Sequence, residues 1–197
     1  MEYTFAVLSK HFFHDDEDIL LAPLANLSDA DAKKLIEDLV RQGPGLENQC
    51  LGILSYLRPE LHCLIDIWTG GNYGDIREGQ DNDTLDQRNQ KIVSDFFTHW
   101  DLLPLPDRDF IHYSHGDVWN GLEVGDSIEL TSFMSCAPHD WRHDSNGPAR
   151  LRFRPSSRAR YLGALTRVPG EREVLIRPNS EFVVDAIHQE ILYLLEV

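Results

Sequence analysis

The apolar residues of the first hundred positions recur at intervals of three and four, the spacing of one buried face of a helix. This pattern predicts helices over residues 28–42, 46–57, 59–68 and 84–100. Ser28 is a suitable N-cap for the first helix, and the turn residues at positions 43–45 end it. In the last helix we expect a buried stripe made of Ile92, Val93, Phe96, Phe97 and Trp100.

From residue 109 the pattern changes to short alternating or β-branched runs bounded by turn residues. It predicts strands over residues 110–113, 127–134, 149–154, 173–176, 181–186 and 191–197. A helical N-terminal part followed by such strands indicates an α+β fold with a mostly antiparallel, two-sheet β core. Because 197 residues suffice for one domain, we expect a helical lobe over 1–65 and a core over 66–197 within a single domain.

The chain carries a formal net charge of −15, which argues against general nucleic-acid binding because phosphate contacts need a basic surface. An acidic surface favours a protein partner whose own surface is basic. Between residues 149 and 178, however, eight arginines accompany only two glutamates. This basic segment is either a place to hold a diphosphate or a solvated, arginine-rich pair of strands.

The three cysteines are odd in number and irregularly spaced, which suits a reducing compartment. No apolar run approaches the roughly 20 residues that span a bilayer, and the N-terminal residues lack the features of a Sec signal. We therefore expect no membrane association, and either a cytoplasmic location or secretion without a Sec signal into a host or competitor cytosol. His139 and His143 lie in a polar loop without an obvious third ligand, so we expect no metal site.

A pair of glutamates, Glu171 and Glu173, precedes an apolar run that predicts a strand. On a strand, residues two apart point to the same face, so the two carboxylates would lie side by side while Arg172 faces away. Their repulsion raises the proton affinity of one of them. Such a pair can stabilise a sugar cation with one carboxylate and deprotonate a nucleophile with the other. Taken alone, the pattern is also typical of a solvated strand edge.

Residues 125–138 contain a Gly-Asp turn, an apolar run and then the sequence SFMSCA from Ser132. This stretch resembles the second signature of the arginine-type mono-ADP-ribosyltransferases, which include clostridial binary toxins, vegetative insecticidal toxins and many bacterial effectors. The family pattern is a strand ending in G-F-x-S-T-S. Ser135 keeps the first serine of the triplet, whereas Cys136 and Ala137 replace the second and third. Ser135 precedes Glu173 by 38 residues, a gap able to hold the family's intervening strand and loops.

Two further stretches extend the resemblance to residues 65–197: residues 177–184 resemble the hairpin after the family's catalytic strand, and residues 68–77 a helix start in the toxins. One position departs from the pattern. The family opens its β core with an Arg-Gly pair, where this chain has His115-Gly116. A neutral histidine can bond a ribose hydroxyl but cannot form the bidentate guanidinium–phosphate contact. Histidine also stands there in the polymerase-type branch and in tRNA phosphotransferases, although His115 packing in a turn is an alternative.

The resemblance implies an ADP-ribosyltransferase-like fold with one NAD-binding catalytic domain and NAD as substrate. Glu173 would stabilise the oxocarbenium-like transition state, Ser135 would orient it, and Glu171 would deprotonate or orient an arginine or hydroxyl acceptor. The implied NAD contacts are His115, Gly116, Phe133, Ser135 and Glu173, and the implied acceptor contacts are Tyr161, Leu165 and Arg167.

Three functions are compatible with these residues. The leading hypothesis is transfer of ADP-ribose from NAD to a target protein by a bacterial toxin or effector, a virulence function carried out in a host cytosol. The second is NAD glycohydrolysis or a nucleic-acid-directed transfer on the same fold, prompted by His115. The third is a catalytically inactive effector that binds a host protein, prompted by the missing arginine and the altered serine triplet.

Overall fold

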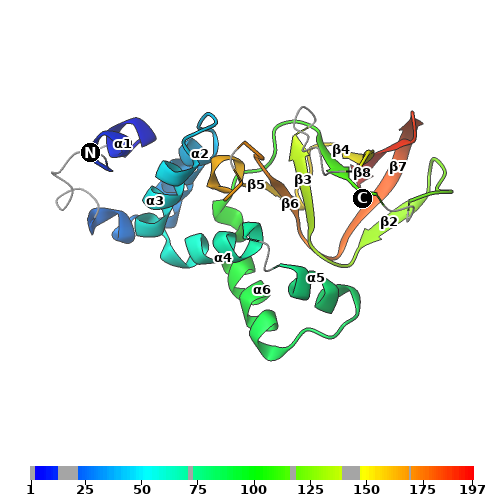
Figure 1. Cartoon of the computed structure of the whole chain (residues 1–197), viewed down its shortest axis with the longest axis horizontal. Coiled ribbons are helices and arrows are strands. Elements are labelled where there is room, and N and C mark those ends of the chain that lie inside the picture. Colours follow the sequence, from blue (N-terminus) through cyan, green and yellow to red (C-terminus); the bar gives the residue numbers. More distant parts are fainter. Residues whose placement is uncertain (1–2, 13–21, 71–72, 116–118, 139–146, 169) are drawn as a thin grey trace. The chain divides into compact units, whose positions relative to one another are not determined.

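The computed structural model describes residues 3–12, 22–70, 73–115, 119–138, 147–168 and 170–197 (Figure 1). These residues form two compact units, each made of three segments. Unit 1 comprises Met1–Ile76, Leu85–Pro104 and Leu162–Arg172, and unit 2 comprises Arg77–Thr84, Leu105–Tyr161 and Glu173–Val197. The boundary expected after residue 65 therefore differs from the structure, because later segments of the chain return to unit 1.

Unit 1 is helical. Its α-helices are α1 (Phe5–Phe12), α2 (Asp29–Val40), α3 (Glu47–Leu57), α4 (Pro59–Thr69) and α6 (Gln87–His99). Short 3-10 turns accompany them: η2 (Ala22–Asn26), η3 (Trp100–Leu102) and η4 (Gly163–Leu165). Helix α5 (Gly74–Asp81) begins in unit 1 and ends in unit 2. In the part of the chain that the structure describes, no helix is long and apolar enough to cross a membrane.

The predicted helices are confirmed, and local side chains account for their starts. The Ser28 hydroxyl accepts a hydrogen bond from the Asp31 amide at 3.2 Å, which caps α2. Asp86 caps α6 in the same way, so that helix begins three residues later than expected. Within the expected stripe, Phe96 and Trp100 are buried, but Phe97 is 37% exposed. The stripe is therefore narrower than the sequence pattern predicted.

Unit 2 contains all of the described strands. They are β1 (Phe110–Tyr113), β2 (Ser127–Leu130), β3 (Met134–Pro138), β4 (Ala149–Phe153), β5 (Ala159–Tyr161), β6 (Val174–Ile176), β7 (Ser180–His188) and β8 (Ile191–Glu196). The spatial order is β2-β7-β8-β4-β1-β3-β6-β5, and every described pair is antiparallel except β4 with β8. The α+β class and the mostly antiparallel pairing are confirmed. The pairs of β6 with β3 and β5 belong to one sheet and the other pairs to a second; β3 joins the two in one continuous strand order, and buried side chains from all eight strands form one core.

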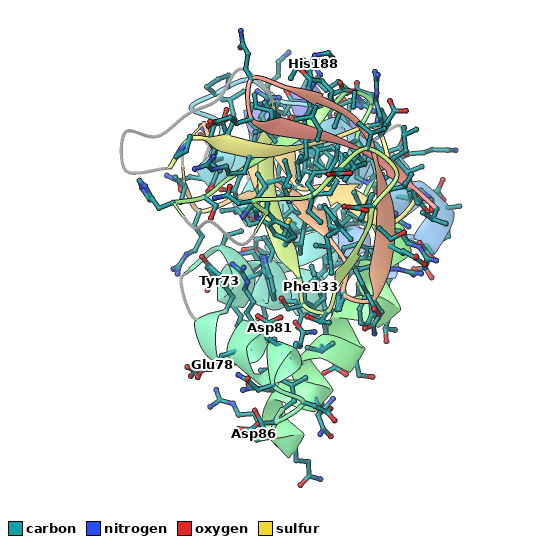
Figure 2. All side chains as sticks on the ribbon, turned by 90° about the vertical axis from the view of Figure 1, so that its right-hand side faces the viewer. Tyr73, Glu78, Asp81, Asp86, Phe133 and His188 are labelled. Carbon is teal, nitrogen blue, oxygen red and sulfur yellow. The ribbon has the colours of Figure 1, made fainter. Side chains whose placement is uncertain are left out.

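The predicted strand over residues 127–134 is in fact two strands, β2 and β3. Strand β2 pairs with β7, whereas β3 pairs with β1 and β6, so the chain changes partners between them. Helix α5 satisfies polar groups at this break (Figure 2). Thr131 Oγ1 donates to Asp81 Oδ1 at 2.9 Å, and the Phe133 amide donates to Gln80 Oε1 at 3.2 Å. The end of α5 thereby fixes the point at which β3 begins.

Candidate active site

Glu173 lies immediately before the first residue of β6 and is buried, with 4% of its surface exposed. In the antiparallel β3–β6 pair, Ser135 lies opposite Leu175 and Cys136 opposite Val174. Cys136 and Val174 belong to the core of unit 2, so strand alternation turns Ser135 and Leu175 to the other face. Glu173 directly precedes Val174 at the end of this pair of strands.

The backbone does not support the expected arrangement, in which Glu171 and Glu173 lie side by side on a strand. Strand β6 begins at Val174, after both glutamates. Arg172 between them has a φ of 54°, in the left-handed region, and alternation of side chains does not extend through such a residue. The division between the two units also falls here, with Glu171 in unit 1 and Glu173 in unit 2. The prediction from strand geometry was therefore wrong for Glu171.

His112, on β1, reaches the backbone of Ser135 and was not among the predicted site residues. Its Nδ1 lies 2.9 Å from the Ser135 carbonyl oxygen, which can only accept, so Nδ1 carries the proton. Burial lowers the pKa of His112, the hydrogen bond to Ser135 raises it in part, and the charge of Arg77 lowers it further. His112 lies two residues after the buried Phe110, so the two side chains point to the same, inward face of β1. A polar residue at an inward position was the signal in the sequence that could have identified His112 as a site residue.

Cys136 adjoins the same group of side chains but does not have the properties of a nucleophile. Burial raises the pKa of its thiol well above the ordinary value, the charge of Glu173 raises it further, and Arg77 lowers it in part. The thiolate is the reactive form, so a buried thiol with a raised pKa is inert. The charges of Glu173 and Arg77 both act on Cys136, and that of Arg77 also acts on His112. These four residues and Ser135 form the candidate site within unit 2.

His115 follows the end of β1 and is exposed. The backbone before it is held by the segment that leads into β4: the Ser114 amide donates to the Pro148 carbonyl oxygen at 3.2 Å. A Cβ atom on Gly147 would lie 2.3 Å from the Ser114 carbonyl carbon and 2.5 Å from the His115 nitrogen. Only glycine permits this close approach. Gly116, the expected carboxamide contact, lies outside the described residues.

No family model and no curated protein matches the sequence of this chain. Solved structures do match its fold. The Vis toxin, an ADP-ribosyltransferase from Vibrio splendidus, has a TM-score of 0.54 at 16% identity, with 87% of each chain covered. An ADP-ribosyltransferase from Clostridium botulinum has a TM-score of 0.53 at 14% identity, covering 85% of this chain and 94% of that one. Exoenzyme S from Pseudomonas aeruginosa, in complex with human 14-3-3 protein beta and bound to carba-NAD, has a TM-score of 0.56 at 16% identity, with 84% and 88% covered.

The chain has the ADP-ribosyltransferase fold. The resemblance that the sequence motifs indicated is thereby confirmed for the architecture. Within this ADP-ribosyltransferase fold, Ser135 lies on β3, and Glu173 directly precedes β6, the strand that pairs with β3. Phe133 has 1% of its surface exposed, so its side chain packs in the interior and its role in NAD binding stays a prediction.

The three predicted acceptor contacts differ in their exposure. Tyr161 is partly buried against the core of unit 2, and Arg167 is exposed. Leu165 has no exposed surface because it lies in the core of unit 1 as part of η4. A side chain without exposed surface offers nothing for a protein acceptor to contact in this conformation, so the role of Leu165, like that of Phe133, stays a prediction.

Carboxylates neutralise part of the positive charge of the arginine-rich segment, residues 149–178, of this ADP-ribosyltransferase fold. At least five of its eight arginines form ion pairs: Arg150 with Glu190 at 3.6 Å, Arg152 with Asp109 at 2.9 Å, Arg154 with Asp109 at 3.9 Å, Arg158 with Glu196 at 3.5 Å and Arg167 with Asp66 at 2.8 Å. These carboxylates offset the positive charge locally. The structure therefore favours the interpretation of an arginine-rich surface over that of a diphosphate site.

Among the residues that the structure describes, no group of three or more His, Cys, Asp or Glu residues could hold a metal ion. His139 and His143, which carried the metal hypothesis, lie outside the described residues.

Proposed function

We propose that this protein is an NAD-dependent mono-ADP-ribosyltransferase that transfers ADP-ribose to an arginine or hydroxyl side chain of a target protein and releases nicotinamide. The observation that carries the proposal is the position of Glu173, a buried carboxylate directly before β6, beside the strand that carries Ser135, in an ADP-ribosyltransferase fold. A buried carboxylate in such a fold can stabilise the positive charge that develops on the ribose when NAD is cleaved.

In the proposed reaction the bond between ribose C1′ and the nicotinamide nitrogen breaks, and nicotinamide leaves with the bonding electrons. Glu173 accepts a hydrogen bond from the ribose 2′-hydroxyl and stabilises the oxocarbenium-like transition state. A lone pair of the acceptor then forms the new bond to C1′, and Glu171 takes the acceptor's proton. Ser135 orients Glu173, and His112 holds the Ser135 backbone through the 2.9 Å hydrogen bond.

The remaining NAD contacts are carried over as parts of the proposal. His115 would bond a ribose hydroxyl, the Gly116 backbone would receive the nicotinamide carboxamide, and Phe133 would line the nicotinamide site. Structural neighbours support NAD as the substrate, since exoenzyme S was solved with carba-NAD and the Clostridium perfringens toxin BECa with NADH. We propose no metal cofactor.

The target would be a protein with a basic surface, because this chain carries a net charge of −15. Tyr161 and Arg167 are the candidate acceptor contacts that retain exposed surface. Exoenzyme S in complex with 14-3-3 protein is a precedent for a protein partner, and several neighbours are toxins. A toxin or effector that acts in the cytosol of another cell fits these observations.

We propose that the two units form a single catalytic domain. Each unit is assembled from three separate segments of the chain, so neither corresponds to a continuous sequence that would be expected to fold alone. The chain passes from unit 1 to unit 2 directly before Glu173.

The test combines two measurements on the purified full chain with NAD labelled in its adenine part. The first is nicotinamide release, and the second is transfer of label to proteins of a host or bacterial lysate. The wild type is expected to show both, and Glu173→Gln to lower both about 100-fold or more. Glu181→Gln, which changes an exposed glutamate on β7, is the matched control and should leave both unchanged.

Each other outcome identifies a different function. Nicotinamide release without labelled macromolecules would indicate a glycohydrolase, and labelled RNA or DNA a nucleic-acid-directed transferase. Absence of NAD binding in calorimetry at about millimolar NAD, together with capture of a protein partner, would indicate an inactive effector. Equal labelling by wild type and Glu173→Gln would remove Glu173 from its proposed role.

A further inference from the structure

The segment that joins β5 to β6, residues 162–172, is built into unit 1 rather than lying open on a surface. Its first five residues, Leu162–Thr166, are all buried, and Leu162, Leu165 and Thr166 have no exposed surface. The 3-10 turn η4 within it packs against α2 and α3. We call residues 162–172 the β5–β6 loop.

Helix α4 anchors the middle of the β5–β6 loop at Arg167. The Arg167 guanidinium pairs with Asp66 through an Nε–Oδ1 distance of 2.8 Å, and the Arg167 amide donates to Thr69 Oγ1 at 3.2 Å. A Cβ atom on Gly70 would lie 2.7 Å from Arg167 Nη1, so the guanidinium occupies the space that a side chain would need. Arg167 therefore has both its backbone and its side chain held by α4.

Helix α3 anchors the end of the same loop at Gly170. The Gly170 amide donates to Glu47 Oε1 at 3.0 Å, across 123 residues of sequence. Glu47 is the first residue of α3 and is only 6% exposed. A carboxylate is favourable at a helix N-terminus, where the first amides are unpaired within the helix. The hydrogen-bonded residue, Gly170, has a φ of 79° and directly precedes Glu171.

We propose that Glu47 is a positioning residue for Glu171. By accepting the Gly170 hydrogen bond, its buried carboxylate fixes the backbone that leads into Glu171 before an acceptor arrives. The inference rests on the proposed function, in which Glu171 handles the acceptor. Transfer to a protein then depends on Glu47, whereas NAD cleavage by water depends on Glu173 and needs no aligned acceptor.

The test compares Glu47→Ala and Glu47→Gln with the wild type. Glu47→Ala removes the acceptor for the Gly170 amide, while the side-chain oxygen of Gln retains one. We expect Glu47→Ala to lower kcat/KM for protein transfer about 10-fold or more and to leave NAD hydrolysis within about twofold, and we expect Glu47→Gln to keep both within about threefold. Glu60→Ala, at an exposed position on α4, is the matched control and should change neither.

Hydrogen exchange provides a readout that needs no activity. In Glu47→Ala the amides of residues 170–172 should exchange faster than in the wild type, Glu47→Gln and Glu60→Ala, while the core strands keep their protection. Equal losses of transfer and hydrolysis, or unchanged transfer with unchanged exchange, would overturn the inference. A wild type that releases no nicotinamide would overturn the proposed function and with it the effect of Glu47 on transfer, whereas faster exchange in Glu47→Ala would still support the anchoring.

Discussion

His112 Nδ1 donates a hydrogen bond to the backbone oxygen of Ser135 at 2.9 Å. In the pairing of β1 with β3, Phe110 lies opposite Pro138 and Ile111 opposite Ala137, so His112 comes directly after these two pairs. Its side chain links β1 to β3 beyond their last backbone pair. This hydrogen bond fixes the imidazole as the Nδ1–H tautomer. It also connects β1 to Ser135 on β3, and β3 pairs with β6, the strand that follows Glu173.

The first prediction tests this hydrogen bond. His112→Phe fills the site but leaves the Ser135 oxygen without the imidazole donor, and we expect it to lower the free energy of unfolding by about 1–3 kcal/mol. His112→Asn keeps a donor at the position of Nδ1 and should lose less. Chemical denaturation at neutral pH compares the three proteins, and equal stability of Phe and Asn variants would show that the hydrogen bond contributes little.

The second prediction concerns the pH dependence of the same residue. Burial lowers the pKa of His112 in the folded protein, and the hydrogen bond to Ser135 offsets part of this effect. The unfolded chain therefore binds a proton near the ordinary pKa of 6.5, whereas the folded protein binds it only at a lower pH. The wild-type free energy of unfolding should therefore fall as the pH drops below about 6.5 and be unaffected by His112 above it. In His112→Asn that part of the slope should be absent when unfolding is measured between about pH 7.5 and about pH 5.

The third prediction tests how the backbone at His115 is held. In Gly147→Ala the new Cβ would lie 2.3–2.5 Å from three backbone atoms of Ser114 and His115, so either the segment before β4 or the end of β1 must move. We expect a loss of about 1–3 kcal/mol in stability, and weaker NAD binding in calorimetry if His115 contacts NAD. Gly43→Ala is the control, because a Cβ there meets nothing within 4 Å, and it should change stability by less than about 1 kcal/mol.

Much of the fold was visible in the sequence where the cause is local. Ser28 caps α2 as its residue type predicts, and β1 has the bounds that its short run of strand-forming residues predicted. The exchange of partners between β2 and β3 was not visible, because Thr131 at the break is itself a strand-forming residue and its hydrogen bond goes to Asp81, 50 residues away. The parallel pairing of β4 with β8 is likewise non-local and leaves no mark in either strand.

The candidate site, too, was predicted only in part, because some of its contacts join residues that are far apart in the sequence. The motif order in the sequence picked out Ser135 and Glu173, whose roles stay predictions; the structure has Ser135 on β3 and Glu173 directly before β6, the strand that pairs with β3. The left-handed backbone of Arg172 was not foreseen, because nothing about an arginine favours a positive φ and the surrounding pattern predicted a strand. Glu47 was missed because its partner, Gly170, lies 123 residues further along the chain.

The fourth prediction concerns the three cysteines. Cys63 is exposed, whereas Cys50 and Cys136 are buried. Burial raises the pKa of Cys50 to about 12, with further contributions from the charges of Glu47 and Asp38, and burial also raises the pKa of Cys136. At about pH 8 a thiol reagent should therefore label Cys63 quickly and the other two only upon unfolding. Mass spectrometry after brief labelling checks this; fast labelling of Cys136 would contradict the burial of the candidate site.

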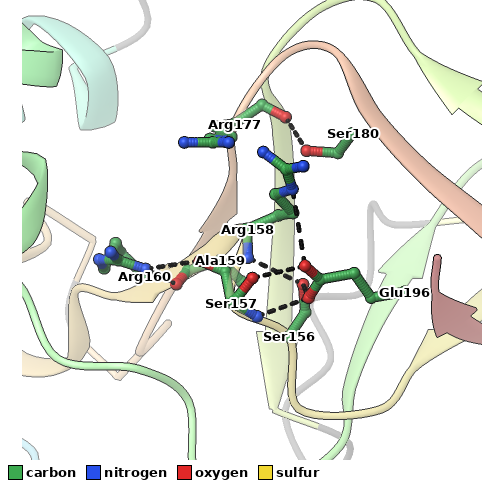
Figure 3. Close-up of polar contacts among 8 residues, drawn as sticks. All are labelled: Ser156, Ser157, Arg158, Ala159, Arg160, Arg177, Ser180 and Glu196. Atoms are coloured by element: carbon green, nitrogen blue, oxygen red, sulfur yellow. Dashed lines mark hydrogen bonds and ion pairs between the residues drawn. The ribbon is translucent and has the colours of Figure 1, made fainter.

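The fifth prediction concerns Glu196, which joins the end of β8 to the turn between β4 and β5 (Figure 3). Its carboxylate accepts hydrogen bonds from the Ser156 hydroxyl at 2.8 Å, from the Ser157 amide at 2.6 Å and from the Ser157 hydroxyl. Arg158 Nε lies 3.5 Å from Glu196 Oε1. Burial alone would raise the pKa of Glu196, but the hydrogen bonds from Ser157 and Ser156 outweigh it, and the pKa is lowered.

Because its folded-state pKa is lowered, Glu196 stabilises the protein above its ordinary pKa of 4.5, and that stability is lost as the pH falls through the lower folded-state value. Glu196→Gln should therefore lower the free energy of unfolding by about 1–3 kcal/mol at neutral pH, because the amide accepts fewer and weaker hydrogen bonds. The difference from the wild type should shrink at acid pH. Glu181→Gln on neighbouring β7 is the control, and a Glu196→Gln deficit that stays constant down to about pH 3 would indicate packing rather than charge as its cause.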